Sequence, residues 1–236
     1  MIAIIVPAYN EALRFKPKQF LSYIESRSHL VFIFVDDGST DNTFDILKSL
    51  EKQNKYQIHT IKLSKNSGKA EAIRQGINYA HTHLYTDYIG FIDGDLEIPL
   101  EQIDKLEKAL KNSDKKVAFS NRILEAKKRP NIVRSAFSGG FKFLTERLFS
   151  YSVNDSQCGC KLFDSNLIPG LFSDKFISKW LFDVEILLRI QKKYDVSELL
   201  VEVPLNRLNE VGTSRIRAMD IFKITKEFLF IYFHYK

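Results

Sequence analysis

The chain has 236 residues, of which 44% are hydrophobic, and it carries a formal net charge of +6. That length and apolar content suit one domain with a full core, and they exclude a disordered chain. The sequence contains no repeat and no low-complexity segment. The modest positive charge is compatible with phosphates, nucleic acid or lipid headgroups as partners and does not choose among them.

The two cysteines and the amino terminus bear on the cellular compartment. Cys158 and Cys160 are separated by one residue, which fits neither a zinc-ligand set nor a disulfide framework. Met1 leads directly into a buried-strand pattern over residues 2–6, without a basic lead or the length of a signal peptide. No uncharged run reaches the roughly 20 apolar residues that span a bilayer. We therefore expect reduced thiols and a cytoplasmic protein.

Residues 1–122 alternate short β-branched runs with amphipathic helical segments. The runs predict strands at residues 2–6, 30–35, 57–63, 88–92 and 116–120. Apolar residues between them recur at helical spacing, as in Ile73, Ile77 and Ala80. This alternation predicts an α/β fold with a mostly parallel central sheet and helices on both faces. Ligands of such sheets bind beyond the carboxyl ends of the strands.

Acidic residues follow the second predicted strand. Asp36 and Asp37 could accept hydrogen bonds from a ribose or a base edge, and Asp41 can cap the next helix. Turn and cap chemistry accounts for residues 38–41 without a ligand, but it does not explain the adjacent pair of acids. After the third strand, Lys69 stands beside a helix N-terminus, where it could help to hold a phosphate. An ordinary surface lysine is the alternative.

The fourth predicted strand ends in alternate carboxylates, Asp93, Asp95 and Glu97. Alternate residues of an extended chain point to one side, so these three could converge on one divalent cation. The backbone at Gly94 permits close approach of a ligand. A solvated acidic turn is the alternative for an isolated pair of this kind.

Four segments in this order resemble the nucleotide-sugar-binding half of family 2 glycosyltransferases, which have the GT-A fold. They are residues 6–11, 35–41, 66–69 and 93–95. The resemblance implies that the donor nucleoside, uridine or guanosine, is surrounded by Pro7, Tyr9, Glu11 and Asp37, with Asp36 beside them. It also implies that Asp93 and Asp95 place Mg²⁺ or Mn²⁺ against the diphosphate, with Glu97 as a further ligand.

Three segments of the second half are similar to dolichyl-phosphate glucosyltransferases and the related mannosyltransferases. They are residues 119–122, 155–163 and 180–185. Cys160 departs from that pattern, in which an aromatic residue is more usual. The resemblance implies a lipid phosphate acceptor and one-step inverting transfer.

The chemistry of that transfer calls for cations. A phosphate acceptor is largely anionic near neutral pH, so it needs positive groups more than a general base. Arg122 follows a predicted strand and is the first candidate, and the other candidates around the acceptor and donor phosphates are Arg134, Gln157, Lys161, Arg207 and Arg215. A hydroxyl acceptor would instead need a carboxylate base. Asp183 is that candidate, and its alternative is a polar residue on a core-facing helix.

Two aromatic-rich segments could contact a membrane. Residues 132–149 are basic as well as apolar, which suits a helix at a lipid surface, and core packing is the alternative. Residues 221–233 are apolar on most faces but short and interrupted by charge, which predicts a docking or interfacial helix. We expect a peripheral protein at the inner face of the membrane.

The sequence thus predicts a single glycosyltransferase domain over residues 1–236. It comprises a nucleotide-sugar-binding half (1–122), an acceptor-binding half (123–215) and a C-terminal helix (216–236). The expected activity is metal-dependent transfer of a hexose, glucose first, from a UDP-sugar to a polyprenyl phosphate, with a GDP-sugar as the alternative donor. A hydroxyl or glycan acceptor and a non-catalytic nucleotide-sugar-binding module are the other readings. Nucleic-acid binding is disfavoured, because the basic residues are scattered and no recognition motif accompanies them.

Overall fold

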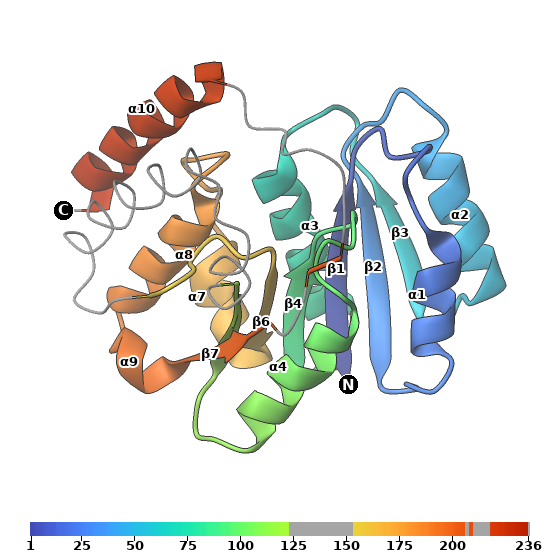
Figure 1. Cartoon of the computed structure of the whole chain (residues 1–236), viewed down its shortest axis with the longest axis horizontal. Helices are drawn as coiled ribbons and strands as arrows, with labels where there is room; N and C mark the ends of the chain where they lie inside the picture. Colours follow the sequence, from blue (N-terminus) through green and yellow to red (C-terminus); the bar gives the residue numbers. More distant parts are fainter. Residues whose placement is uncertain (123–152, 206–207, 210–217, 236) are drawn as a thin grey trace.

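The computed structural model describes residues 1–122, 153–205, 208–209 and 218–235 (Figure 1). Its described strands form one seven-stranded sheet in the order β3-β2-β1-β4-β6-β5-β7. The strands are β1 (Ile2–Ala8), β2 (Leu30–Asp36), β3 (Ile58–Lys62), β4 (Tyr88–Ile92), β5 (Val117–Asn121), β6 (Cys160–Asp164) and β7 (Leu200–Pro204). Only β6 runs antiparallel to its neighbours in this sheet, so the sheet is mostly parallel, as the sequence predicts.

All five strands expected in the first half are confirmed, whereas β6 was not anticipated. A lysine at the second position of this five-residue strand breaks the apolar pattern that identifies a buried strand. In the structure Lys161 is fully buried and bound to an acid on a helix, so this lysine belongs to the core.

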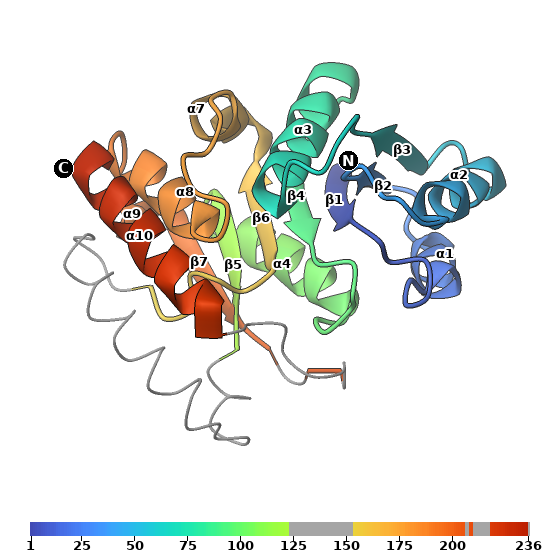
Figure 2. The ribbon, with the colours of Figure 1, turned by 90° about the horizontal axis from the view of Figure 1, so that it is seen from above.

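Helices cover both faces of the sheet (Figure 2). One face is covered by α1 (Pro17–Ile24), α2 (Thr43–Gln53) and α4 (Glu101–Lys111), and the other by α3 (Lys69–His83), α7 (Ile168–Phe172) and α8 (Phe182–Gln191). Successive residues of β1 point to opposite faces, Ile4 into the first layer and Ile5 into the second. Both are fully buried, which explains why β1 is apolar throughout.

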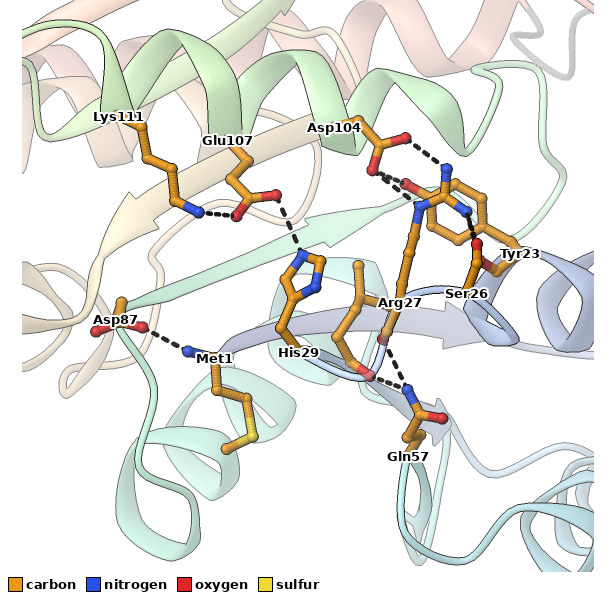
Figure 3. A network of polar contacts seen from close by, with 11 residues as sticks. Met1, Tyr23, Ser26, Arg27, His29, Gln57, Asp87, Asp104, Glu107 and Lys111 are labelled. Carbon is orange, nitrogen blue, oxygen red and sulfur yellow. Dashed lines mark hydrogen bonds and ion pairs between the residues drawn. The ribbon is translucent and has the colours of Figure 1, made fainter.

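Polar groups at the amino ends of the strands hold this fold together (Figure 3). Arg27 donates to both carboxylate oxygens of Asp104 on α4, at 3.0 and 2.9 Å, and its guanidinium lies 4.0 Å from the ring centroid of Tyr23. The Tyr23 hydroxyl donates to Asp104 as well, at 2.9 Å. The amino group of Met1 pairs with Asp87 nearby. This end of the sheet is therefore occupied by contacts between its own elements.

The C-terminal helix α10 (Ala218–Tyr235) packs on the protein body beside α8. Phe228 and Ile231 are buried against the core, so this side of the helix docks on the protein, one of the two possibilities expected for the segment. Its opposite side exposes Leu229, Phe230 and Phe233, with exposed fractions of 51%, 57% and 78%. Among the described residues, no helix is long and apolar enough to cross a membrane.

Candidate active site

The loops after β1 and β2 are tied to each other at the carboxyl edge of the sheet. Asn10 N–H donates to Ser39 Oγ at 3.0 Å, and Thr40 N–H donates to the Asn10 side chain at 2.9 Å. Gly38 has a φ of 69°, and a Cβ there would lie 2.5 Å from the backbone of Lys65. Only glycine fits this close approach, which brings the loop after β3 into the same edge.

Three expected nucleoside-binding residues lie at the end of β1 and in the loop that follows it. Pro7 is half-buried, and Tyr9 keeps 41% of its surface exposed. Glu11 forms an ion pair with Arg14 at 3.1 Å, and its backbone N–H donates to Thr43 at 2.8 Å. An exposed aromatic ring beside a positioned loop can stack on a base, so the placement is compatible with the predicted role.

Asp36 and Asp37 occupy different environments. Asp37 accepts the N–H groups of Ser67 and Gly68, at 2.7 and 2.8 Å, and so shapes the turn that begins α3. Burial raises the pKa of Asp37, although these two N–H groups act in the opposite direction. Asp36 is fully buried and accepts Ser39 N–H at 3.2 Å through Oδ1, while its Oδ2 has no hydrogen-bond partner among the described residues. Of the two acids, Asp36 retains an acceptor for a ligand.

Lys69 starts α3 and bridges to the end of β4. Its Nζ lies 2.5 Å from Asp93 Oδ1 and 6.0 Å from the ring centroid of Phe182. Burial would lower the pKa of this ammonium, but the charges of Asp93, Asp183 and Asp95 outweigh that effect and raise it. The structure thus places a cation against Asp93, at the helix N-terminus where the sequence predicts phosphate binding.

Asp93 is held in place by the loop of the second half. Its N–H donates to Gly159 O at 3.0 Å, and a Cβ on Gly159 would lie 2.1 Å from Asp93 Oδ2. Glycine between the two cysteines is therefore needed for the Asp93 carboxylate to occupy this position. Gly94 is close-packed too, because a Cβ there would lie 3.2 Å from Pro7 O.

The two other carboxylates of this strand end belong to a tight turn. Asp95 accepts the N–H of Glu97 at 3.1 Å, and Leu96 between them has a φ of 56°. Asn209 binds the backbone oxygens of Leu96 and Glu97, at 2.8 and 2.9 Å. The turn is thereby fastened to the segment that follows β7.

The donor set suits a cation that takes further ligands from its substrate. No group of three or more His, Cys, Asp or Glu side chains among the described residues is arranged to hold a metal ion, so Asp93, Asp95 and Glu97 do not form a closed set of ligands. Magnesium is usually bound by one or two carboxylates together with substrate phosphates. Asp93 and Asp95 supply that number, and the Lys69 ammonium shows that the Asp93 carboxylate accommodates positive charge.

Arg122 follows β5 and is bound by Asp155 in a bidentate pair. Its Nε and Nη2 donate to the two carboxylate oxygens at 2.8 and 3.0 Å, and its N–H donates to the same acid at 3.0 Å. Burial raises the pKa of the Asp155 carboxyl, but the Arg122 guanidinium outweighs it and holds that pKa below its usual range. Glu202 of β7 accepts the N–H groups of Asn154 and Asp155, at 3.1 and 3.2 Å. Arg122 is therefore positioned directly by Asp155, and Glu202 in turn binds the backbone N–H of Asp155.

Lys161 and Asp183 form an ion pair inside the core. Lys161 Nζ lies 2.5 Å from Asp183 Oδ1, donates to Cys158 O at 2.7 Å, and is fully buried. Asp183 is only 4% exposed, and burial raises its pKa in spite of Lys161. Lys161 and Asp183, which were both predicted as site residues, are therefore paired with each other. Gln157 lies half-buried in the loop beside them.

The sequence model of glycosyl transferase family 2 matches residues 3–172 of the chain, which include nearly all of β1, all of β2 to β6, and Asp36, Asp37, Lys69, Asp93, Asp95 and Arg122. The chain belongs to glycosyl transferase family 2. It is a glycosyltransferase with the mostly parallel, Rossmann-like sheet of the GT-A fold. Arg134, Arg207 and Arg215, which were expected to face phosphates, lie outside the described residues, as does the aromatic segment 132–149.

Curated relatives match nearly the full chain. The dolichyl-phosphate beta-glucosyltransferase of Saccharomyces cerevisiae is 31% identical, over 98% of this chain and 73% of its own. The human dolichyl-phosphate beta-glucosyltransferase is 30% identical, over 99% of this chain and 75% of its own. Among solved structures, the glucosyl-3-phosphoglycerate synthase of Mycobacterium tuberculosis superposes with a TM-score of 0.69 at 15% identity, over 100% of this chain and 80% of its own. A structure of that synthase with Mn²⁺, uridine diphosphate and glucosyl-3-phosphoglycerate gives a TM-score of 0.65 at 16% identity, over 98% of this chain and 77% of its own.

Two residues of the site carried no role in the sequence-based prediction. Asp155 is the first residue of the segment 155–163, whose resemblance was noted, but nothing in the sequence singles it out as the partner of Arg122. Glu202 had no signal, because it lies on a half-buried strand, 47 residues after its partner Asp155.

Proposed function

We propose that this glycosyltransferase transfers glucose from UDP-glucose to a polyprenyl phosphate, with inversion and with a divalent cation. The observation that carries the proposal is the loop 155–159, whose two ends touch the two halves of the site. Asp155 binds Arg122 at one end, and Gly159 contacts Asp93 at the other. A donor diphosphate at Asp93 would therefore lie beside the positioned guanidinium expected to meet the acceptor.

The donor half supplies the charges that a nucleoside diphosphate needs. Asp93 and Asp95 would hold Mg²⁺ or Mn²⁺, and Lys69 at the N-terminus of α3 would bind the phosphates. The cation, when bound, neutralises the negative charge that builds on the departing diphosphate. Support comes from solved relatives of the fold that contain Mn²⁺ and uridine diphosphate. A UDP-sugar is the proposed donor, and a GDP-sugar is the alternative outcome.

The acceptor half supports a phosphate acceptor over a hydroxyl. A phosphate monoester has a second pKa of about 6, so it needs no strong general base at neutral pH. The carboxylate that a hydroxyl acceptor would require, Asp183, is buried and paired with Lys161. Arg122 is better placed for the acceptor, since its pairing with Asp155 fixes its plane. The names of the curated relatives, which are dolichyl-phosphate beta-glucosyltransferases, agree with this choice.

We further propose that the protein is cytoplasmic and meets its lipid substrate as a peripheral protein at the inner face of the membrane. The outer side of α10 combines Leu229, Phe230 and Phe233 with Lys226, whose ammonium lies 5.9 Å from the ring centroid of Phe230. Aromatic residues flanked by lysine suit an interface with anionic lipid. Phe233→Asp should reduce sedimentation with phosphatidylglycerol-containing vesicles and leave the melting temperature unchanged. Equal sedimentation of the variant and the wild type would contradict this contact.

A transfer assay tests the activity directly. Labelled UDP-glucose, UDP-galactose and GDP-mannose are each incubated with short-chain polyprenyl phosphate or the matching polyprenol, with Mn²⁺ or with a chelator. We expect a metal-dependent product from UDP-glucose and polyprenyl phosphate alone. Transfer to the polyprenol in preference to its phosphate would overturn the acceptor, and full transfer under chelation would overturn the metal.

A further inference from the structure

Lys179, a residue without a sequence signal, lies beside the N-terminus of α3. It belongs to the loop between α7 and α8 and is exposed. Its Cδ would lie 3.8 Å from a Cβ placed on Gly68, the residue directly before α3. Because the ammonium group is two bonds beyond Cδ, Lys179 brings a second positive charge to the helix end where Lys69 supplies the first.

The start of α8, which directly follows this loop, approaches the site at a second place. Phe182 follows Lys179 by three residues, and its ring lies 6.0 Å from the Nζ of Lys69. That ammonium is itself engaged by Asp93 at 2.5 Å. The loop carrying Lys179 is therefore packed against the start of α3, next to the carboxylate expected to face the diphosphate.

Two carboxylates hold this loop by its backbone. Glu227 of α10 accepts the N–H groups of Lys179 and Trp180, at 3.2 and 2.9 Å. Glu185 of α8 accepts those of Ile177 and Ser178, at 2.9 and 3.3 Å. Hydrogen bonds to ionised acceptors are stronger than neutral ones, so the position of Lys179 depends on the docking of α10.

We propose that Lys179 binds the diphosphate of the donor together with Lys69, and that Glu227 of α10 positions it for this contact. The inference rests on the proposed nucleotide-sugar donor. A helix N-terminus favours anions but contributes little binding free energy at an exposed site. The Lys69 ammonium, in turn, is paired with Asp93 as well. Lys179 adds charge from a separate element. Through Glu227, α10, the helix proposed to contact lipid, thereby also supports binding of the donor.

The chain contains a built-in reporter, since Trp180 is its single tryptophan and lies next to Lys179. Full-length wild type and Lys179→Met are titrated with uridine diphosphate and with uridine, in the presence of Mn²⁺, and tryptophan fluorescence is followed. Loss of one charge-assisted phosphate contact should weaken diphosphate binding about tenfold. Uridine affinity should not change, because uridine lacks the phosphates.

The matched control is Lys108→Met, which removes an exposed lysine from α4 on the other face of the sheet. It should bind both ligands as the wild type does. A Lys179→Met protein that binds uridine diphosphate within twofold of the wild type would overturn the proposal. Equal losses for uridine and uridine diphosphate would overturn it as well, because they would indicate a general disturbance of the site.

Glu227→Gln tests the role of α10. Weakening the two hydrogen bonds to the loop should reduce uridine diphosphate affinity about threefold and shift the emission of Trp180. Wild-type affinity in this variant would overturn the positioning by α10. A wild type that binds neither uridine diphosphate nor guanosine diphosphate would overturn the proposed donor and this inference together. If the wild type binds uridine diphosphate and Lys179→Met binds it equally well, only the role of Lys179 is overturned.

Discussion

Around β1 to β4, the acidic side chains Asp37 and Asp95 at the strand ends accept backbone N–H groups, whereas in the second half Asp155 and Asp183 are bound by basic side chains. Asp37 accepts the N–H groups of Ser67 and Gly68 in the turn before α3, and Asp95 accepts the N–H of Glu97. In the second region, Asp183 pairs with Lys161 and Asp155 pairs with Arg122.

This difference separates two uses of charge. Asp95, which shapes a turn at the sheet edge, is only partly buried, so a cation can reach it. A carboxylate paired inside the core fixes the position of a loop and loses access to a ligand. Lys69 and Asp93 stand between the two patterns, since they form an ion pair at the sheet edge with side-chain exposures of 40% and 31%.

The largest effect on activity is expected at Asp95, whose carboxylate must remain accessible to a metal ion. Asp95→Ala should lower kcat/KM by about a thousandfold, because a metal-holding carboxylate contributes several kcal/mol of charge stabilisation. The variant should also lose Mn²⁺-dependent donor binding while its circular dichroism spectrum stays unchanged. The matched control, Asp114→Ala on an exposed loop, should retain full activity. Unchanged turnover in Asp95→Ala would refute the metal assignment.

Breaking the buried pair should affect stability more than a surface change does. Lys161→Met leaves Asp183 uncompensated in the core and should cost roughly 3 to 5 kcal/mol of unfolding free energy. Urea denaturation measures this loss. The double variant Lys161→Met with Asp183→Leu should recover much of it. A double variant as unstable as the single one would show that the pair is not the reason for the loss.

The Arg122–Asp155 pair predicts an acid-sensitive contribution. Asp155 has a pKa below its ordinary value of 3.8, so its stabilising effect is complete above pH 3.8 and is lost as the pH falls through the folded-state pKa. Asp155→Asn should cost roughly 3 kcal/mol at pH 7, and less below pH 3.8. Melting temperatures between pH 7 and pH 3 test this, and parallel curves for the two proteins would contradict it. The KM for the acceptor should rise, because Arg122 loses its fixed orientation.

The smallest effect is expected at the amino ends of the strands. Tyr23→Phe removes the hydrogen bond to Asp104 and should cost about 1 kcal/mol of stability. It should leave kcat/KM unchanged, since this network lies at the amino ends of the strands (Figure 3), whereas the site residues follow the carboxyl ends of the strands. A change in activity larger than the change in stability would show that the two ends of the sheet are coupled.

The sequence by itself determined the first half of the molecule. Apolar runs and helical spacing located β1 to β5, and parallel strands bring their carboxyl ends to one edge, so Asp36, Asp93 and Lys69 could be placed together in advance. The turn contact of Asp95 joins it to Glu97, two positions on, and local patterns report such contacts, whereas the contact of Asp37 with Ser67, 30 positions on, depends on the fold.

Only the tertiary structure decided β6 and the charged contacts of the second half. No local pattern makes β6 a strand, because Lys161 can be buried only when Asp183, 22 residues away, neutralises it. Arg122 is oriented by Asp155, 33 residues on, and Lys179 reaches Gly68 from a loop held by α10. Charged pairs of this kind carry no periodicity, so their partners become known only when the chain is folded.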